Sequence, residues 1–331
     1  MEQKKLMSEL KRGVVHKAYL LYGDERFLVA HCAQAIEKAI FGDQTGTKDV
    51  FDSTTPAHII TMAADNLPFF ASHRLIYVRD SKLFASGRKD DAETMANYLP
   101  NIPDHTVVVF VESEVDKRSK LYKQMDKTGI TVDCQPPTPN ELATWATRLA
   151  QKNGVTMTTP IASHFVRTVG VDMTALSQEM HKLAAYCGSG NEITVADINT
   201  ICTQTFESRI FDLTKAMFAG RVSDALAMYQ NMLRMKESPI MVLTMIIRQF
   251  RIILLATSAK KKGLTIIQTA TAFNLRDFMV SEALEQGRKF TEDQLVGALK
   301  FCLKTDVDVK TGVIAPELGV ELLIIKYGAA G

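Results

Sequence analysis

Cysteine, net charge and long apolar runs are all scarce in this sequence, and each shortage excludes a class of protein. The five cysteines are scattered without a C-x-x-C pair, which argues against a disulfide framework and against a zinc site. The net charge of +2 lacks the basic balance of a high-affinity nucleic-acid-binding chain. No signal-peptide pattern follows Met1, and no apolar run approaches the ~20 residues of a membrane span. We therefore expect a cytoplasmic protein.

Patterns that carry catalysis or bind metal ions are missing as well. None of the seven histidines has a second histidine at the i, i+4 spacing that helical metal sites use. No G-x-S-x-G nucleophile motif occurs. The sequence therefore predicts no catalytic residue, no bound metal ion and no cofactor.

The first part of the chain alternates strand-like apolar runs with helical patterns. Strands are expected at 18–23, around 50–51, and at 74–80, 107–111 and 130–134. Such alternation predicts a parallel sheet covered by helices, with right-handed crossovers. The later part of the chain is helical throughout, so the predicted fold class is α/β followed by all-α.

Prolines mark the change between these two parts. Pro136, Pro137 and Pro139 interrupt regular structure, and Thr138 and Glu141 have the spacing of a helix capping box. Helices are expected near 139–152, 160–169, 173–187 and 195–203, and longer ones from 209 onward. Glycines follow the first three helices, as C-terminal caps do. We predict three domains, an α/β domain at 1–138, a small helical domain at 139–207 and a larger helical domain at 208–331.

The first strand-to-helix turn is where a phosphate-binding loop would lie. Such a loop needs several glycines, a lysine for the phosphates and a hydroxyl for magnesium. Here the turn contains only Gly23, followed by Asp24 and Glu25, whose carboxylates would repel an anion at the helix N-terminus. We interpret it as a degenerate nucleotide loop in which Asp24 caps the helix. Glu112, after the 107–111 strand, is interpreted as a solvated strand end.

A different segment carries the best candidate binding residues. Leu67, Pro68, Phe69 and Phe70 lie between an expected helix and an expected strand. Adjacent phenylalanines in an extended segment point to opposite sides, so one core cannot easily bury both. Either one ring is buried in the core of its own domain, or the pair forms an exposed apolar patch that binds a protein partner.

Basic residues of the third domain are weaker candidates for contacts with DNA or with other subunits. They are Arg248, Arg251, Lys260, Lys261, Lys262 and Lys310. A solvated helix C-terminus explains the lysine run equally well, because cations are favoured there.

Five stretches, in order and spread over nearly the whole chain, resemble the delta subunit family of the bacterial DNA polymerase III clamp loader. They are 19–28, 67–74, 116–122, 210–213 with Pro239 and 248–251 downstream, and 306–312. The resemblance implies an AAA+-like first domain that does not bind ATP, a helical lid domain and a helical collar domain that joins the loader ring.

The resemblance also implies partners and a mode of action. Phe69 and Phe70 would enter a pocket on the sliding clamp (the beta subunit) and help to open it, and the 67–70 segment would be the clamp-binding element. The other expected partners are the gamma or tau ATPase subunits, the delta-prime subunit and primer–template DNA within the assembled loader. The chain would then be a non-catalytic subunit of the polymerase holoenzyme.

Two other functions remain open at this stage. An active ATPase of the same loader would need the phosphate loop that the 23–27 turn lacks. A helical DNA-binding regulator with an α/β sensor domain would need a basic recognition helix, and the nearly neutral charge argues against one.

Overall fold

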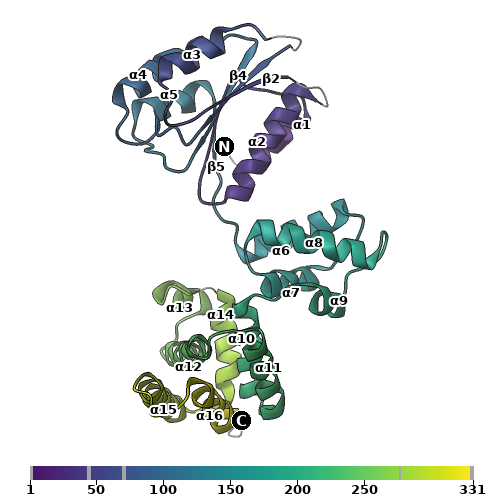
Figure 1. Ribbon diagram of the computed structural model, residues 1–331, viewed down its shortest axis with the longest axis vertical. Helices are drawn as coiled ribbons and strands as arrows, with labels where there is room; N and C mark the ends of the chain where they lie inside the picture. Colours follow the sequence, from purple (N-terminus) through teal and green to yellow (C-terminus); the bar gives the residue numbers. More distant parts are fainter. Residues whose placement is uncertain (1–2, 43–45, 69–71, 276, 329–331) are drawn as a thin grey trace. The chain divides into compact units, whose positions relative to one another are not determined.

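The computed structural model describes residues 3–42, 46–68, 72–275 and 277–328 (Figure 1). It divides into two compact units, Met1–Glu141 and Leu142–Gly331, and each unit is described by itself below. The first unit is α/β, and the described part of the second contains helices but no strand. The predicted fold class is confirmed.

One five-stranded parallel sheet forms the centre of the first unit. Its strands are β1 (Ala18–Tyr22), β2 (Thr47–Phe51), β3 (Arg74–Arg79), β4 (Thr106–Glu112) and β5 (Ile130–Asp133). They lie in the order β2-β3-β4-β1-β5, and every pairing is parallel. All residues of β1 and β4 are buried, because both strands are interior to a sheet that helices cover on both faces.

Five helices cover this sheet. They are α1 (Gln3–Lys11), α2 (Arg26–Phe41), α3 (Ala57–Asp65), α4 (Lys89–Tyr98) with a short 3-10 turn η1 (Leu99–Asn101), and α5 (Lys120–Thr128). Figure 1 shows α1 and α2 on one face and α3, α4 and α5 on the other. The connection from β1 to β2 runs across the sheet toward the β2 edge, whereas the connections from β2 to β3, β3 to β4 and β4 to β5 run toward the β5 edge. A single crossover handedness therefore places their helices on opposite faces.

The parallel arrangement sorts the loops of this unit into two groups. Every strand-to-helix turn lies at the end of the sheet formed by the carboxyl ends of the strands, here called the carboxyl edge. Every helix-to-strand connection lies at the opposite end, here called the amino edge. The turn at 23–25 follows β1 and lies at the carboxyl edge, whereas Leu67 and Pro68 precede β3 and lie at the amino edge. The two candidate sites are therefore at opposite ends of one sheet.

The second unit is built from helices that begin with α6. They are α6 (Pro139–Lys152), which starts in the last residues of the first unit, α7 (Thr159–Val169), α8 (Met173–Cys187), α9 (Val195–Ile201), α10 (Phe206–Phe218), α11 (Val222–Arg234), α12 (Pro239–Lys261), α13 (Ile266–Ala272), α14 (Asp277–Gln286) with the 3-10 turn η2 (Gly287–Lys289), α15 (Glu292–Lys310) and α16 (Pro316–Gly328). The helices predicted at 139–152 and 173–187 are confirmed at those bounds.

Helix α12 forms the core of the later bundle. Within the described residues it is the one helix that is long and apolar enough to cross a membrane. It packs against α14, α15 and α16, and Phe250 makes edge-to-face contacts with Phe218 and Tyr327, whose ring centroids lie 5.0 and 5.1 Å away. We interpret the apolar character of α12 as that of a bundle core helix.

The predicted division of the helical part at 207/208 stays a prediction. One observation supports it, because one buried cluster draws all its members from Ile210 to Ile324 and none from α6 to α9. The 208–331 region therefore has a hydrophobic core of its own.

Candidate functional site

The turn after β1 is closed by the chain's own backbone. The amide of Glu25 donates to the carbonyl of Cys134 at 3.0 Å, and the amide of Cys134 donates to the carbonyl of Tyr22 at 2.6 Å. Gly23 has a φ of 123°, and a Cβ at this position would lie 2.4 Å from the Cys134 carbonyl oxygen. Only glycine fits there. The segment after β5 thus packs directly against the turn that a phosphate-binding loop would need to leave open.

Helix α2 is capped by Glu25 and not by Asp24, so that prediction is wrong. The Glu25 carboxylate accepts a hydrogen bond from the amide of Phe27 at 3.0 Å, and Asp24 is exposed. The reason lies in the contact just described, since bonding to Cys134 holds Glu25 in an extended conformation. The helix can begin only at the next residue, Arg26.

Glu112 is buried, which corrects its interpretation as a solvated strand end. Only 1% of it is exposed, and its carboxylate accepts bonds from the Ser81 amide at 3.1 Å, the Lys82 amide at 3.1 Å and the Ser81 hydroxyl. Burial raises the pKa of Glu112, while these hydrogen bonds oppose the rise. Both Asp80 and Lys82 have left-handed backbone angles, with φ of 46° and 61°. The carboxylate therefore holds a strained turn against the end of β4.

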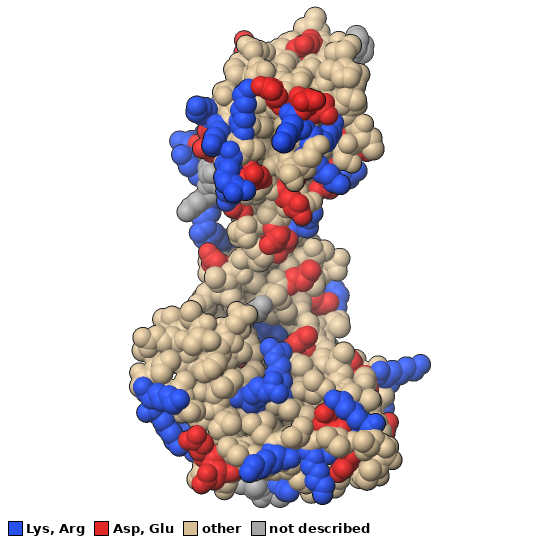
Figure 2. Space-filling model, turned by 90° about the vertical axis from the view of Figure 1, so that its left-hand side faces the viewer, with Lys and Arg blue, Asp and Glu red and all other residues tan. Residues whose placement is uncertain are grey.

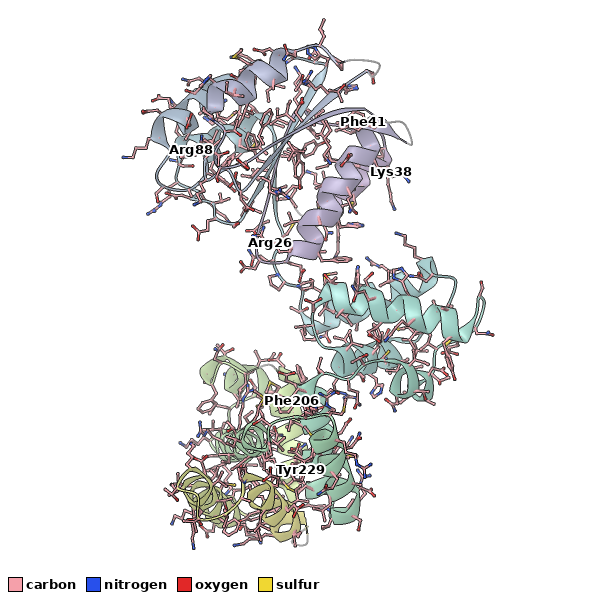
Figure 3. The ribbon with its side chains drawn as sticks, in the orientation of Figure 1. Arg26, Lys38, Phe41, Arg88, Phe206 and Tyr229 are labelled. Atoms are coloured by element: carbon pink, nitrogen blue, oxygen red, sulfur yellow. The ribbon has the colours of Figure 1, made fainter. Side chains whose placement is uncertain are left out.

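Arg26 and Arg88 complete the carboxyl edge (Figure 3). The Arg26 guanidinium donates to the Ser113 hydroxyl at 2.9 Å and so links the turns that follow the adjacent strands β1 and β4. In open parallel sheets a ligand crevice forms where neighbouring strands send their helices to opposite faces, as β1 and β4 do here. The hydrogen bond between Arg26 and Ser113 lies across this position between β1 and β4.

Arg88 is a residue that the sequence analysis missed. Its guanidinium donates to the carbonyls of Ser53, Ser81 and Thr55 at 3.1, 3.0 and 2.7 Å and pairs with Asp91 at 2.7 Å. It joins the loops after β2 and β3. Two of these carbonyls, those of Ser53 and Thr55, are more than 30 residues away in the sequence, so no local sequence pattern marks Arg88.

The carboxyl edge therefore consists of side chains and amides that bond to one another. In the described ranges no group of three or more His, Cys, Asp or Glu residues could hold a metal ion. The predicted degenerate loop at Gly23, Asp24 and Glu25 has the geometry of a structural turn.

At the amino edge, the end of α3 leads into the apolar segment. The Thr106 hydroxyl donates to the Ala64 carbonyl at 2.7 Å, and the Tyr98 hydroxyl donates to the Asp65 carboxylate at 2.6 Å. Leu67 follows directly and is 71% exposed. Phe69 and Phe70 lie outside the described residues. The described part of the segment thus presents an apolar side chain to solvent just after a firmly held helix end.

Two of the six predicted basic candidates of the second unit form ion pairs, and the other four are exposed. Lys261 pairs with Glu292 at 2.8 Å and Lys310 with Asp306 at 2.7 Å. The other four predicted residues, Arg248, Arg251, Lys260 and Lys262, are exposed. Figure 2 shows Lys and Arg in separate groups with Asp and Glu between many of them. Their predicted role in contacts with DNA or other subunits stays a prediction.

Comparison with known proteins accounts for most of the chain. Residues 19–135 match the family model described as DNA polymerase III, delta subunit, and residues 207–327 match the model of the C-terminal domain of the DNA polymerase III delta subunit. The DNA polymerase III subunit delta of Bacillus subtilis (strain 168) is 26% identical over 329 residues, which cover 96% of this chain and 94% of that protein.

One solved structure of a delta protein agrees with this match. The Bacillus subtilis DNA clamp loader delta protein YqeN has 25% sequence identity and a TM-score of 0.64, and covers 98% of this chain and 99% of its own. A Thermotoga maritima RuvB structure is 12% identical with a TM-score of 0.38 over 86% of this chain and 85% of that chain. The family models and the full-length relatives agree with the resemblance found in the sequence, and the chain belongs to the DNA polymerase III delta subunit family as a component of the DNA clamp loader.

Proposed function

We propose that this delta subunit binds the sliding clamp through the 67–70 segment and stabilises the open form of the ring. The observation that carries the proposal is the 71% exposure of Leu67 directly after a helix end that β4 and α4 hold in place. An exposed apolar side chain on a rigid support is typical of a protein-binding site. Phe69 and Phe70 are the residues that we expect to enter the clamp.

The mechanism that we propose is a shift in population. A subunit that binds the open clamp more tightly than the closed clamp shifts the ring toward opening, by as much as its two affinities differ. Burying each phenylalanine ring contributes roughly 1.5–3 kcal/mol. Burial of two rings is therefore enough for a modest difference between the affinities for the open and the closed clamp, provided that the receiving pocket is already formed.

We further propose that the chain is a non-catalytic subunit and that its ATPase neighbours supply the energy. The packing of Cys134 against the Gly23 turn supports this, because the backbone amide of Glu25 cannot both donate to the Cys134 carbonyl and bind a phosphate. An isolated chain that binds a fluorescent ATP analogue tightly would contradict this part of the proposal.

The remaining assignments follow from membership of the family. We propose a lid at 139–207 and a collar at 208–331, and we propose that the collar joins the gamma or tau subunits and the delta-prime subunit. The separate core of 208–331 supports this division. Primer–template DNA is the expected partner within the assembled loader, and the cytoplasm is the expected compartment.

The test is clamp binding by a variant that lacks both rings. The double substitution Phe69→Ala, Phe70→Ala is expected to weaken binding of the full chain to its sliding clamp at least 100-fold, since roughly 3–6 kcal/mol of apolar burial is removed. Surface plasmon resonance measures this, and circular dichroism shows whether the variant is folded.

A matched control removes two exposed rings elsewhere. Phe273 and Phe278 are each 41% exposed in the second unit, and the variant Phe273→Ala, Phe278→Ala is expected to bind the clamp like the wild type. If the Phe69 and Phe70 variant binds normally, or if the control weakens binding equally, the site assignment is wrong.

A further inference from the structure

Arg74 is a nearly buried arginine that bridges a neighbouring strand and the apolar segment. It is the first residue of β3 and only 8% exposed. Its Nε donates to Oδ2 of Asp49 at 2.7 Å, and its Nη2 lies 2.7 Å from the same oxygen. Its Nη1 donates to the carbonyl of Leu67 at 3.4 Å. One guanidinium therefore joins strand β2 to the residue at which the 67–70 segment begins.

The ion pair fixes the direction of this side chain. Asp49 belongs to β2, and Arg74 pairs with Thr47 in the parallel register, so Asp49 lies two residues further along the neighbouring strand. The two side chains are 10% and 30% exposed. An arginine removed from water in this way requires a paired carboxylate, and its planar fork directs the remaining N–H groups along set directions. With Nε and Nη2 occupied by Asp49, Nη1 points to Leu67.

Arg74 also connects both ends of the loop that contains the 67–70 segment. Its backbone amide donates to the carbonyl of His105 at 2.7 Å, which attaches the end of the loop to the connection before β4. Its side chain holds the beginning of the loop at Leu67. The bonds to Ala64 and Asp65 described above hold the two residues at the end of α3. Both ends of the loop are thus fixed to the amino edge of the sheet.

We propose that Arg74 is a positioning residue for clamp binding, which it serves by holding the beginning of the 67–70 segment through its fork between Asp49 and Leu67. The inference rests on the proposed function of that segment. A segment fixed at both ends reaches the clamp with its binding conformation already populated, and loss of the fork lowers the populated fraction. The apparent affinity falls by the same factor.

The experiment compares arginine-to-lysine substitutions at two partly buried ion pairs of one unit. Arg74→Lys retains a cation for Asp49 but cannot also reach Leu67, because an ammonium lacks the fork. We expect its affinity for the sliding clamp to fall roughly tenfold, chiefly through slower association, while the melting temperature changes little. Hydrogen exchange at the amide of Asn66, which donates to the Ala63 carbonyl at 3.4 Å just before Leu67, is expected to become faster. The matched control is Arg88→Lys at the carboxyl edge, where the Arg88–Asp91 side chains are 18% and 32% exposed.

Each outcome decides between positioning and general stability. Arg88→Lys is expected to leave clamp affinity unchanged, and Arg74→Gln is a second variant expected to weaken binding at least as much as Arg74→Lys. Normal clamp affinity in both Arg74 variants overturns the inference if the Phe69, Phe70 double variant loses binding. An equal loss in Arg88→Lys also overturns it. If the double variant itself binds normally, the proposed function fails instead, so the two failures are distinguishable.

Discussion

At the scale of single residues, the carboxyl edge contains residues whose roles depend on partners far along the chain. Gly23 is required because the Cys134 carbonyl lies where a Cβ would be. Glu112 is required because the amides of Ser81 and Lys82 point to its carboxylate. Neither role is visible in the neighbouring sequence, which suggests a degenerate nucleotide loop at Gly23 and a solvated acid at Glu112.

Glu112 allows a test of its structural role. Glu112→Gln replaces one acceptor oxygen by an amide donor, which faces a backbone amide that also donates. We expect the free energy of unfolding to fall by about 1–3 kcal/mol, because a buried donor loses its partner. Urea denaturation monitored by circular dichroism measures the loss. Glu114→Gln, two residues further on and exposed, is expected to change stability by less than about 0.5 kcal/mol. Equal stability of the two variants would contradict the role described for Glu112.

At the scale of elements, several helix ends are correctly predicted from local signals, although the predicted start of α10 at 209 differs from the observed start at Phe206, which Thr205 caps. Thr138 and Glu141 form the expected capping bonds before α6. Gly170 and Gly188 follow α7 and α8 with positive φ values, as predicted for C-terminal caps. The predicted cap of α2 is wrong by one residue, because the bond from the Glu25 amide to the Cys134 carbonyl determines where the helix starts. Local chemistry determines an end unless a distant contact competes with it.

Helix α9 offers a direct measure of such a local signal. Thr194 and Asp197 form a complete capping box at its start, in which each side chain accepts a bond from the other residue's amide. Thr194→Ala is expected to lower the free energy of unfolding by about 1 kcal/mol. Thr200→Ala within the same helix, where the hydroxyl donates only to the carbonyl one turn earlier, is the control and is expected to be nearly neutral. Thermal denaturation distinguishes them, and an equal loss in both would show that the cap contributes nothing.

At the scale of the whole molecule, the parallel sheet separates the turn at 23–25 from Leu67, although both belong to the same α/β unit. The turn lies at the carboxyl edge of this unit, and Leu67 lies at its amino edge. Leu67 and Pro68 are therefore at the opposite end of the sheet from the predicted degenerate nucleotide loop. Leu67 is next to the place where α3, β3 and β4 meet.

The proposed collar can be tested by its independence. A fragment of residues 203–331 retains Thr205, which caps α10, and all members of the later buried cluster. We expect it to unfold cooperatively on heating, because its core needs no residue from α6 to α9. A fragment of residues 222–331 lacks α10, which packs against α11, α12 and α16, and is expected to lose the cooperative transition. A non-cooperative 203–331 fragment would show that the division at 207/208 does not mark a domain.

The sequence by itself determined the fold class, the bounds of α6 and α8, the family and the residues to test on the clamp. These depend on local patterns of apolar residues, caps and turns, which the chain carries in short stretches. Only the tertiary structure decided that Glu112 is buried, that Glu25 caps α2 and that Arg74 connects Asp49 to Leu67. Each of these depends on polar groups that are distant in sequence and meet only when the strands pair. A buried polar group must bond to whatever partner folding brings to it, and the order of residues does not name that partner.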